Sequence, residues 1–260
     1  MKVSLITVTY NSERTLQDTI DSVLSQSYQN VEYIIVDGAS SDNTVDIIKQ
    51  NVSRFAGRLF WISEKDQGLY DAMNKGIRMA TGDVVGILNS DDVFMDDHVL
   101  EDVVSQFSPS VDAIFGNLVF VDEFDTDKIV RCWTGTPYRS FQSGWHPAHP
   151  TFYVRRIIYD KYGLFDTSFQ VSADFELMLR FIERFKIRAN YFNRYMVKMR
   201  IGGESTGTLK NIIRGNLNVL RAFEKNNLSV SFFYPVKRLL PKLFDRLKCM
   251  LGLYQKLDKI

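Results

Sequence analysis

Short apolar runs alternate with amphipathic stretches along the first half of the chain. Runs typical of buried strands lie at Val3–Thr9, Tyr33–Val36, Leu59–Ser63 and Val84–Leu88. Between the first two runs, apolar residues recur at helical spacing at Leu16, Ile20, Val23 and Leu24. Two further helices are predicted over Thr44–Gln50 and Tyr70–Ala80. This alternation predicts an α/β fold, a mostly parallel doubly wound sheet with helices on both faces.

The second half has a different pattern. Ala113–Val121 and Ile129–Trp133 predict a hairpin, and the proline-containing stretch Thr134–Pro150 predicts a shaped loop. A helical stripe follows Ser172-Ala173-Asp174 and includes Phe175, Met178, Leu179 and Ile182. A glycine-rich loop is expected over Ile201–Thr208, and a long helix is expected from Leu209 onwards.

Length and composition narrow the class of protein. At 260 residues the chain is long enough for one large domain, or for a domain with an appendage. Hydrophobic residues make up 45% and charged residues 24%, which excludes disorder and collagen-like repeats. Two distant cysteines, Cys132 and Cys249, favour reduced thiols inside the cell. A formal net charge of +1 gives no reason to expect nucleic acid binding.

The charge is distributed unevenly. Residues 229–260 carry seven Lys or Arg against Asp245 and Asp258, so this tail is +5 and the rest of the chain is −4. Leucines interleave with these basic residues, which fits a helix on an anionic lipid surface and equally a helix packed on protein. No apolar run approaches the ~20 residues needed to span a bilayer, and Val3 to Val8 is too short for a signal peptide. We therefore expect a cytoplasmic protein, either soluble or peripheral at the inner face of the membrane.

Polar residues follow each predicted strand of the first half. Ligands bind outside the carboxyl ends of the strands in such sheets, so these residues should meet at one edge. Carboxylates that gather at one edge repel one another unless cations or hydrogen-bond donors compensate their charge. A divalent ion with a phosphorylated ligand would do so. The strand ends are Thr9-Tyr10-Asn11, Asp37-Gly38, Glu64-Lys65-Asp66 and Ser90-Asp91-Asp92.

The pair Asp91-Asp92 allows two interpretations. Mg²⁺ and Mn²⁺ take hard oxygen ligands, commonly one or two carboxylates plus substrate phosphates. One aspartate would then hold the metal and the other a ribose hydroxyl. The alternative is an acidic helix start before Val93.

Asp37 also allows two interpretations. It is a candidate for accepting a hydrogen bond from a nucleotide base, and the alternative is an ordinary Asp-Gly turn before a capped helix. Neither GxGxxG after the first strand nor GxxxxGK[ST] occurs, which disfavours a dinucleotide site and a P-loop.

Taken in order, these segments resemble a known family. SLITVTYN, VDGASSDNT, EKDQGLYDAMNKGIRMATGD and LNSDD resemble the nucleotide-binding half of family 2 glycosyltransferases with the GT-A fold. HPTFYVRR and SADFELMLR resemble that family's acceptor-side half. The resemblance implies a GT-A domain over residues 1–225, with a nucleotide-sugar-binding half (1–107) and an acceptor-side half (108–225). A basic C-terminal helical extension (226–260) would follow.

The resemblance assigns roles on the donor side. Tyr10 would pack against the base, Asp37 would hydrogen-bond its edge, and Asp66 lies in an acidic turn that lines the same pocket. Asp91 and Asp92 match the motif that holds the ribose and the metal-bound diphosphate. Asn89 replaces the usual first aspartate, which leaves open whether Asp91 or Asp92 contacts Mg²⁺ or Mn²⁺ directly.

The resemblance places Asp174 at the general base of inverting members. An acceptor hydroxyl must lose its proton as it attacks the anomeric carbon, and a nearby carboxylate can take it. The alternative for Asp174 is a helix N-cap.

Two further residues are candidates near the acceptor or a lid. His149 would line the acceptor site or approach the metal, unless a backbone group satisfies it. Arg200 would fold over the diphosphate when a loop closes; the alternative is an exposed arginine in a flexible surface loop.

The function expected from the resemblance is inverting, metal-dependent transfer of a sugar from a nucleotide-sugar donor. A UDP-sugar is the expected donor, and a glycan or a lipid-linked saccharide is the expected acceptor. The alternatives are a sugar-phosphate nucleotidyltransferase and a non-catalytic nucleotide-binding module. A nucleotidyltransferase would favour a glycine-rich, basic loop directly after the first strand, where Tyr10-Asn11-Ser12 stands instead.

Overall fold

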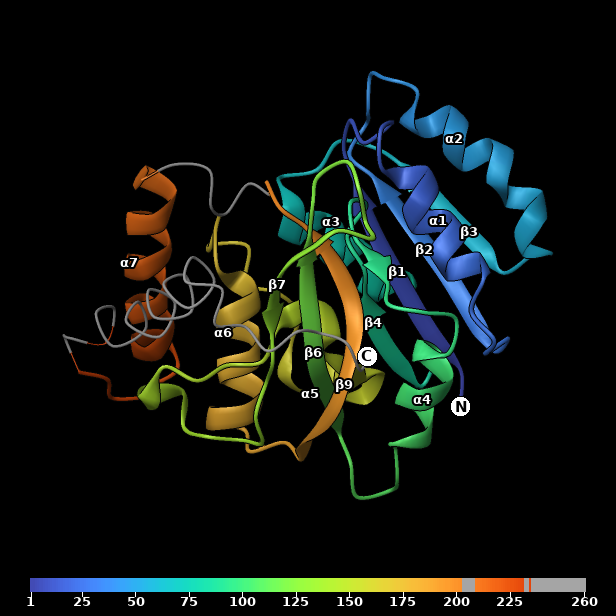
Figure 1. Ribbon diagram of the computed structural model, residues 1–260. Helices are drawn as coiled ribbons and strands as arrows, with labels where there is room; N and C mark the ends of the chain where they lie inside the picture. Colours follow the sequence, from blue (N-terminus) through green and yellow to red (C-terminus); the bar gives the residue numbers. More distant parts are fainter. Residues whose placement is uncertain (203–208, 232–233, 235–260) are drawn as a thin grey trace.

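The computed structural model describes residues 1–202, 209–231 and 234. Within these residues one continuous nine-stranded sheet runs through the protein, with helices on both of its faces (Figure 1). The expected glycine-rich loop at 201–208 and the basic extension at 226–260 lie largely outside the described residues.

The first half contains four parallel strands and the helices that connect them. Its strands are β1 (Val3–Thr9), β2 (Val31–Asp37), β3 (Leu59–Ser63) and β4 (Val84–Ile87). Its helices are α1 (Leu16–Leu24), α2 (Thr44–Asn51) and α3 (Leu69–Met79), with a 3₁₀ turn η1 at Val52–Phe55. Each of these strands and helices lies within a few residues of the segment that the apolar pattern predicts.

The second half adds strands of mixed direction. Its strands are β5 (Val93–Phe94), β6 (Ala113–Val121), β7 (Ile129–Trp133), β8 (Tyr153–Arg155) and β9 (Ala189–Arg200). Its helices are α4 (Val99–Ser105), α5 (Arg156–Tyr162), α6 (Ala173–Leu179) and α7 (Leu209–Lys225). Short 3₁₀ turns occur at Phe141–Ser143 and His149–Thr151, and a π-helical turn at Arg180–Arg184 extends α6.

The strands follow the order β3-β2-β1-β4-β8-β6-β9-β5, and β7 pairs with β6 outside this path. The pairs β1–β2, β1–β4 and β2–β3 are parallel. Antiparallel pairing of β8 with β4 and β6 then joins the two halves into one sheet. The expected α/β class is confirmed, with the parallel part concentrated in the first half.

Two hydrophobic cores lie on opposite faces of the sheet because successive strand residues point to opposite sides. On β2, Ile34 and Val36 pack in a core with α3, α6 and α7, whereas Tyr33 and Ile35 pack in a core with α1, α2 and α4. Both faces of the parallel strands are therefore buried. This explains why their sequences are continuously apolar rather than alternating.

Two alternatives from the sequence are wrong. Asp91-Asp92 does not begin a helix; it leads into strand β5, and the next helix starts only at Val99. Asp174 is not the N-cap of its helix, because Ser172 occupies that position and Asp174 lies within the first turn of α6.

A buried carboxylate ties the amino end of the parallel sheet together. Glu32 on β2 is only 4% exposed and accepts hydrogen bonds from Ser4, from both Thr81 N and Oγ1 (2.6 Å each) and from Gly82 N (3.0 Å), and it pairs with Lys2. Burial alone would raise the pKa of Glu32, but these donors outweigh it and lower the pKa to about 2. The ionised form is therefore the one that stabilises the fold.

Replacing Glu32 with Gln is expected to lower the free energy of unfolding at neutral pH by about 1–3 kcal/mol, because several buried donors lose a charged acceptor. Since the folded-state pKa lies below the usual value of 4.5, the contribution of Glu32 is complete above pH 4.5 and is lost as the pH falls towards 2. Urea unfolding of wild type and Glu32→Gln at several pH values measures both effects. Asp46→Asn, which removes only an exposed pair with Lys49, should change stability by less than about 0.5 kcal/mol; a similar loss in both variants would contradict the assignment.

Candidate active site

The carboxyl ends of the first three strands are level with one another. Thr9 on β1 pairs with Asp37 on β2, and Asp37 pairs with Ser63 on β3. The Asp37 side chain is fully buried and accepts hydrogen bonds from Ser40 N (3.0 Å), Ser40 Oγ (2.5 Å) and Ser63 Oγ (2.6 Å). Asp37 therefore shapes the turn after β2 and presents it at the sheet edge.

Tyr10, Gly38 and Asp66 lie next to one another beside that turn. A Cβ added at Gly38 would lie 3.0 Å from Oδ2 of Asp66 and 3.4 Å from Cδ2 of Tyr10, so only glycine leaves this approach free. Tyr10 is 65% exposed, so a face of its ring is open to a planar ligand. Lys75 on α3 holds Asp66 through an ion pair of 2.6 Å. Tyr10 and Asp66, two of the residues that the sequence placed around a nucleotide base, therefore flank the turn that Asp37 begins.

Three non-glycine residues with left-handed backbone conformation lie within two residues of candidate site residues. Asn11 (φ +49°) follows Tyr10, Ala39 (φ +61°) follows Gly38, and Ser172 (φ +69°) precedes the helix that carries Asp174. Asn11 is held in place because its Oδ1 accepts from Ser41 N at 2.9 Å. Strained backbone of this kind persists where the surrounding structure over-determines it, commonly at functional sites.

Asp91 and Asp92 follow β4 at the same edge, and their surroundings differ. Asp92 is fully buried; its Oδ2 accepts from Asn89 Nδ2 at 2.9 Å, while its Oδ1 has no hydrogen-bond partner among the described residues. Asp91 is only partly buried. Burial and the charge of Asp91 raise the pKa of Asp92 well above its usual value. Burial also raises the pKa of Asp91, and Arg200 and His149 only partly offset it.

These two carboxylates fit a divalent cation. They offer hard oxygen atoms, one of them buried and unpartnered, in a place where negative charge is poorly compensated. Within residues 1–202, 209–231 and 234, no group of three or more His, Cys, Asp or Glu side chains is arranged to hold a metal ion. Other ligands, such as phosphate oxygens, would have to complete the coordination.

The location of Arg200 differs from the expectation. It is the last residue of β9 and is 6% exposed, so it does not lie in a flexible surface loop. Its guanidinium donates to the carbonyl oxygens of Asp91 (2.7 Å) and Glu123 (3.2 Å) and to Asp18 Oδ2 on α1 (2.5 Å). Arg200 therefore joins the aspartate turn to α1 and to the β6–β7 turn, because those partners satisfy its buried charge.

Asp174 is held by two side chains from other elements. Tyr70 on α3 donates its hydroxyl to Oδ1 at 3.1 Å, and Nδ1 of His149 lies 3.3 Å from Oδ2. Burial alone would raise the pKa of Asp174, but His149, the backbone N–H of Phe175 and Tyr70 outweigh it and lower the pKa. Asp174 is therefore ionised at neutral pH.

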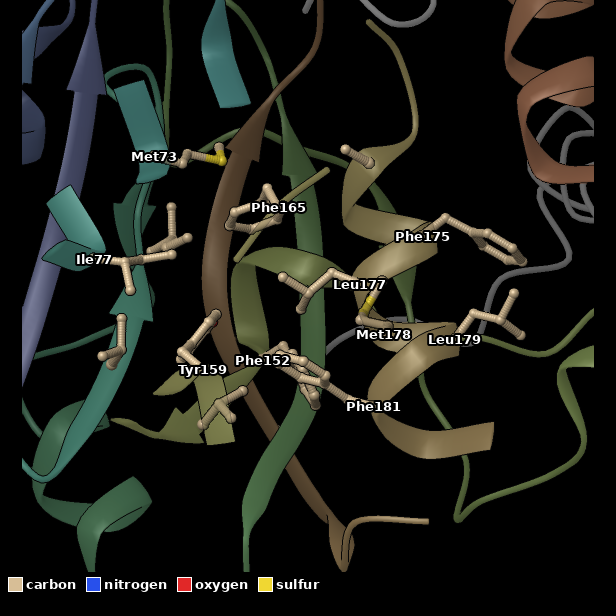
Figure 2. Packing of buried hydrophobic residues seen from close by; sticks show 14 of the residues in the cluster. Met73, Ile77, Phe152, Tyr159, Phe165, Phe175, Leu177, Met178, Leu179 and Phe181 are labelled. Atoms are coloured by element: carbon tan, nitrogen blue, oxygen red, sulfur yellow. The ribbon is translucent and has the colours of Figure 1, made fainter. Parts of the chain in front are cut away.

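His149 links the two acidic parts of the site. The turn that carries it packs against both β4 and α6, and His149 lines one small cavity with Asp174 and with Ile87 at the end of β4. It also lowers the pKa of both Asp91 and Asp174. Behind Asp174 and His149 a cavity of about 10 Å³, room for one water molecule, is closed by apolar groups. Several of these groups are labelled in Figure 2, which shows Leu177 and Met178 of α6 beside Phe152, Tyr159 and Phe165.

The structure places the sequence candidates in two groups. Tyr10, Asp37 and Asp66 lie at the ends of β1 to β3, and His149 lies beside Asp174. Arg200 lies at the Asp91–Asp92 turn instead of in a loop. The sequence did not predict that Tyr70 contacts Asp174, although Tyr70 lies inside the EKDQGLYDAMNKGIRMATGD segment. Its partner Asp174 is 104 residues away in the sequence. A local pattern carries no signal for such a contact.

Comparisons with known proteins agree with this geometry. A family model described as "Glycosyl transferase family 2" matches residues 4–170, a range that ends before Asp174. An uncharacterized glycosyltransferase of Mycobacterium tuberculosis is 34% identical over 188 residues, which cover 68% of this chain and 68% of that protein.

Solved structures are similar in fold. The mannosyltransferase PcManGT from Pyrobaculum calidifontis, in complex with GDP-Man and Mn²⁺, matches 96% of this chain and 70% of its own, with a TM-score of 0.66 and 21% identity. TarS 1–349 of S. aureus, in complex with UDP-GlcNAc, matches 99% of this chain and 77% of its own, with a TM-score of 0.61 and 16% identity. At these identities the likeness shows the fold alone, which is the expected GT-A fold.

One negative finding concerns membranes. None of the helices in the described part of the chain is both long enough and apolar enough to cross a bilayer. The basic segment considered for membrane contact lies largely outside that part.

Replacing Asp92 with Asn is expected to stabilise the protein without metal or nucleotide by about 1 kcal/mol at neutral pH, because it removes a poorly compensated buried charge. The amide oxygen can still accept from Asn89. Since the pKa of Asp92 is raised above the usual 3.8, the advantage of the variant grows as the pH rises from there. Chemical unfolding at about pH 5 and about pH 8 measures it. Asp97→Asn, an exposed neighbour, is the control, and a destabilised Asp92→Asn would contradict the prediction.

Proposed function

Because the chain belongs to glycosyl transferase family 2, we propose that it transfers a sugar, with inversion, from a nucleotide-sugar donor to a saccharide or lipid-linked acceptor. One arrangement carries this proposal: His149 lies 3.3 Å from Asp174, and both line one small cavity with Ile87, the last residue of the strand that leads into the Asp91–Asp92 turn. A donor bound between these groups would have its diphosphate on one side and a proton acceptor on the other. Family membership favours this over a nucleotidyltransferase and over a non-catalytic module.

The donor's nucleoside would bind at the ends of β1 to β3. The exposed ring of Tyr10 offers a face for the base, and Gly38 leaves room for it beside Asp66. Asp37 fixes the turn through Ser40 and Ser63 and would present the edge that reads the base. Two neighbours of similar fold carry UDP-GlcNAc and GDP-Man, so a nucleoside diphosphate sugar is the class of donor we propose, with a UDP-sugar preferred.

Asp91 and Asp92 would hold Mg²⁺ or Mn²⁺ together with the diphosphate. Asp91 is the better candidate for direct contact, because it is partly exposed whereas Asp92 is buried behind it against Asn89. When bound, such an ion stabilises the negative charge that develops on the departing nucleoside diphosphate. Arg200 would keep the Asp91 turn in place through its bond to the Asp91 carbonyl oxygen.

Asp174 would act as the general base. The acceptor hydroxyl oxygen attacks the anomeric carbon and forms the new glycosidic bond, while the bond from that carbon to the phosphate oxygen breaks. The nucleoside diphosphate leaves with the bonding electron pair, and the hydroxyl proton passes to the Asp174 carboxylate. Attack from the side opposite the leaving group inverts the anomeric configuration. The lowered pKa keeps Asp174 unprotonated and ready for this step.

Replacing Asp174 with Asn is expected to lower kcat by roughly 10²–10⁴-fold, because the isosteric amide cannot accept the proton. Donor affinity should stay within about twofold, since in this proposal Asp174 contacts the acceptor hydroxyl and not the nucleotide. Release of UDP or GDP from UDP-GlcNAc or GDP-mannose, with water or added saccharide as the acceptor, measures turnover. Nucleotide titration measures affinity.

Asp160→Asn is the matched control, because Asp160 forms only an exposed pair with Arg156. Full turnover in Asp174→Asn, or lost donor binding with turnover retained, would overturn the assignment of the base.

Thermal shifts with UDP and with GDP, each with and without Mn²⁺, are expected to single out one nucleotide, and its shift should require the metal. A ligand that binds only the folded state raises stability by RT ln(1 + [L]/Kd). Asp91→Asn should abolish the metal-dependent part of the shift. A shift of equal size without metal would contradict the proposed role of Asp91 and Asp92.

A further inference from the structure

We propose that Tyr70 is a positioning residue for Asp174: its hydroxyl, supplied by α3 on the donor side, fixes one carboxylate oxygen and thereby orients the base. This inference rests on the proposed function, in which Asp174 takes the proton. Tyr70 itself would contact neither donor nor acceptor. It acts through Asp174.

The position of Tyr70 is built into the fold rather than left to a mobile side chain. Its ring stacks on Phe165 with a centroid distance of 5.6 Å and an interplanar angle of 28°. One helical turn further along α3, the buried Asn74 binds both the carbonyl oxygen and the N–H of Phe165, each at 2.9 Å. These two hydrogen bonds fix the backbone of Phe165 against α3, and the stacked Phe165 ring restrains the ring of Tyr70.

The two oxygens of Asp174 receive donors from different directions. Oδ1 accepts from Tyr70 at 3.1 Å, and Oδ2 faces His149 Nδ1 at 3.3 Å. Rotation of the carboxylate would break both contacts. A carboxylate has about four lone-pair positions, and these two side chains with the Phe175 N–H occupy three of them, so a proton can be accepted while the carboxylate stays oriented.

The largest contributions that lower the pKa of Asp174 come from few groups. They are Tyr70 from α3, His149 and His146 from the loop before β8, and the Phe175 N–H of α6 itself. The cavity behind it is lined by apolar side chains and by Tyr159. Because few polar groups contribute, the loss of one hydrogen bond should change the pKa and the orientation of Asp174 markedly.

The same helix also reaches the donor pocket. Lys75 of α3 pairs with Asp66 (2.6 Å) and Glu64 (2.8 Å) in the acidic turn after β3. One rigid segment therefore fixes a wall of the donor pocket and the orientation of the base. If the Tyr70–Asp174 hydrogen bond had only a structural role, it would stabilise the fold and leave the reactivity of Asp174 unchanged.

The test compares Tyr70→Phe with Tyr153→Phe. Tyr153 is also buried, but its hydroxyl has no hydrogen-bond partner in the described part of the chain, so its loss should leave turnover unchanged. With UDP-GlcNAc or GDP-mannose, Tyr70→Phe is expected to lower kcat about 10–100-fold and to leave KM for the donor within about twofold. In the Asp174→Asn background the same change should have no further effect on kcat. Equal, additive losses in both backgrounds would overturn the proposal.

A second measurement does not depend on turnover. In protein labelled with ¹³C at the aspartate carboxyl carbons, the signal missing from Asp174→Asn identifies Asp174, and its titration gives the pKa. Tyr70→Phe should raise that pKa by about one unit, because the ionised form loses a donor, whereas Tyr153→Phe should not. Both variants keep His146 and His149, so the difference reports Tyr70 alone.

The two proposals fail in different ways. An unchanged Asp174 titration in Tyr70→Phe would overturn the positioning role, whatever the reaction is. A shifted titration together with full turnover in Asp174→Asn would support the contact and overturn Asp174 as the base.

Discussion

Two adjacent carboxylates, one fully buried and one partly buried, are the constraint on which the arrangement of this site depends. Asp92 is fully buried, and burial raises the pKa values of both carboxyl groups more than Arg200 and, for Asp91, His149 lower them. The elements around them converge to hold this turn: Thr19 of α1 bonds to the Asp92 carbonyl oxygen and Arg200 of β9 to that of Asp91. The fold thus holds the backbone of the turn tightly while leaving the carboxylates short of partners, an arrangement suited to an incoming cationic ligand.

The strands of the parallel half could be predicted because local sequence alone determines them. Their burial on both faces gives continuous apolar runs, and the helices between them show a clear stripe. The strands missed in the second half depend on partners instead. β5 has two residues and exists through its pairing with β9, whose twelve residues mix polar and apolar side chains. Because tertiary pairing decides such segments, no local pattern reveals them.

Only the part of the candidate site that lies at strand ends could be predicted, because the strand topology determines where those residues lie. Strand ends that meet at one edge place Tyr10, Asp37, Asp66 and Asp91 together, and the structure has them there. The contacts that orient Asp174 could not be found in this way, because each joins residues far apart in the chain. Arg200 shows the same limit: beside a glycine-rich segment it looked exposed, yet its guanidinium is buried against three partners.

The left-handed residues at the edge of the site have a consequence for how this enzyme could adapt to heat. Each costs roughly 1–2 kcal/mol relative to a relaxed backbone, and Ala39 and Ser172 have no glycine's freedom to offset that cost. A thermostable descendant could gain stability by relaxing them, yet Ala39 lies two residues from Asp37 and Ser172 lies two residues from Asp174. Selection for thermal stability and selection for turnover would therefore act in opposite directions on the same few residues.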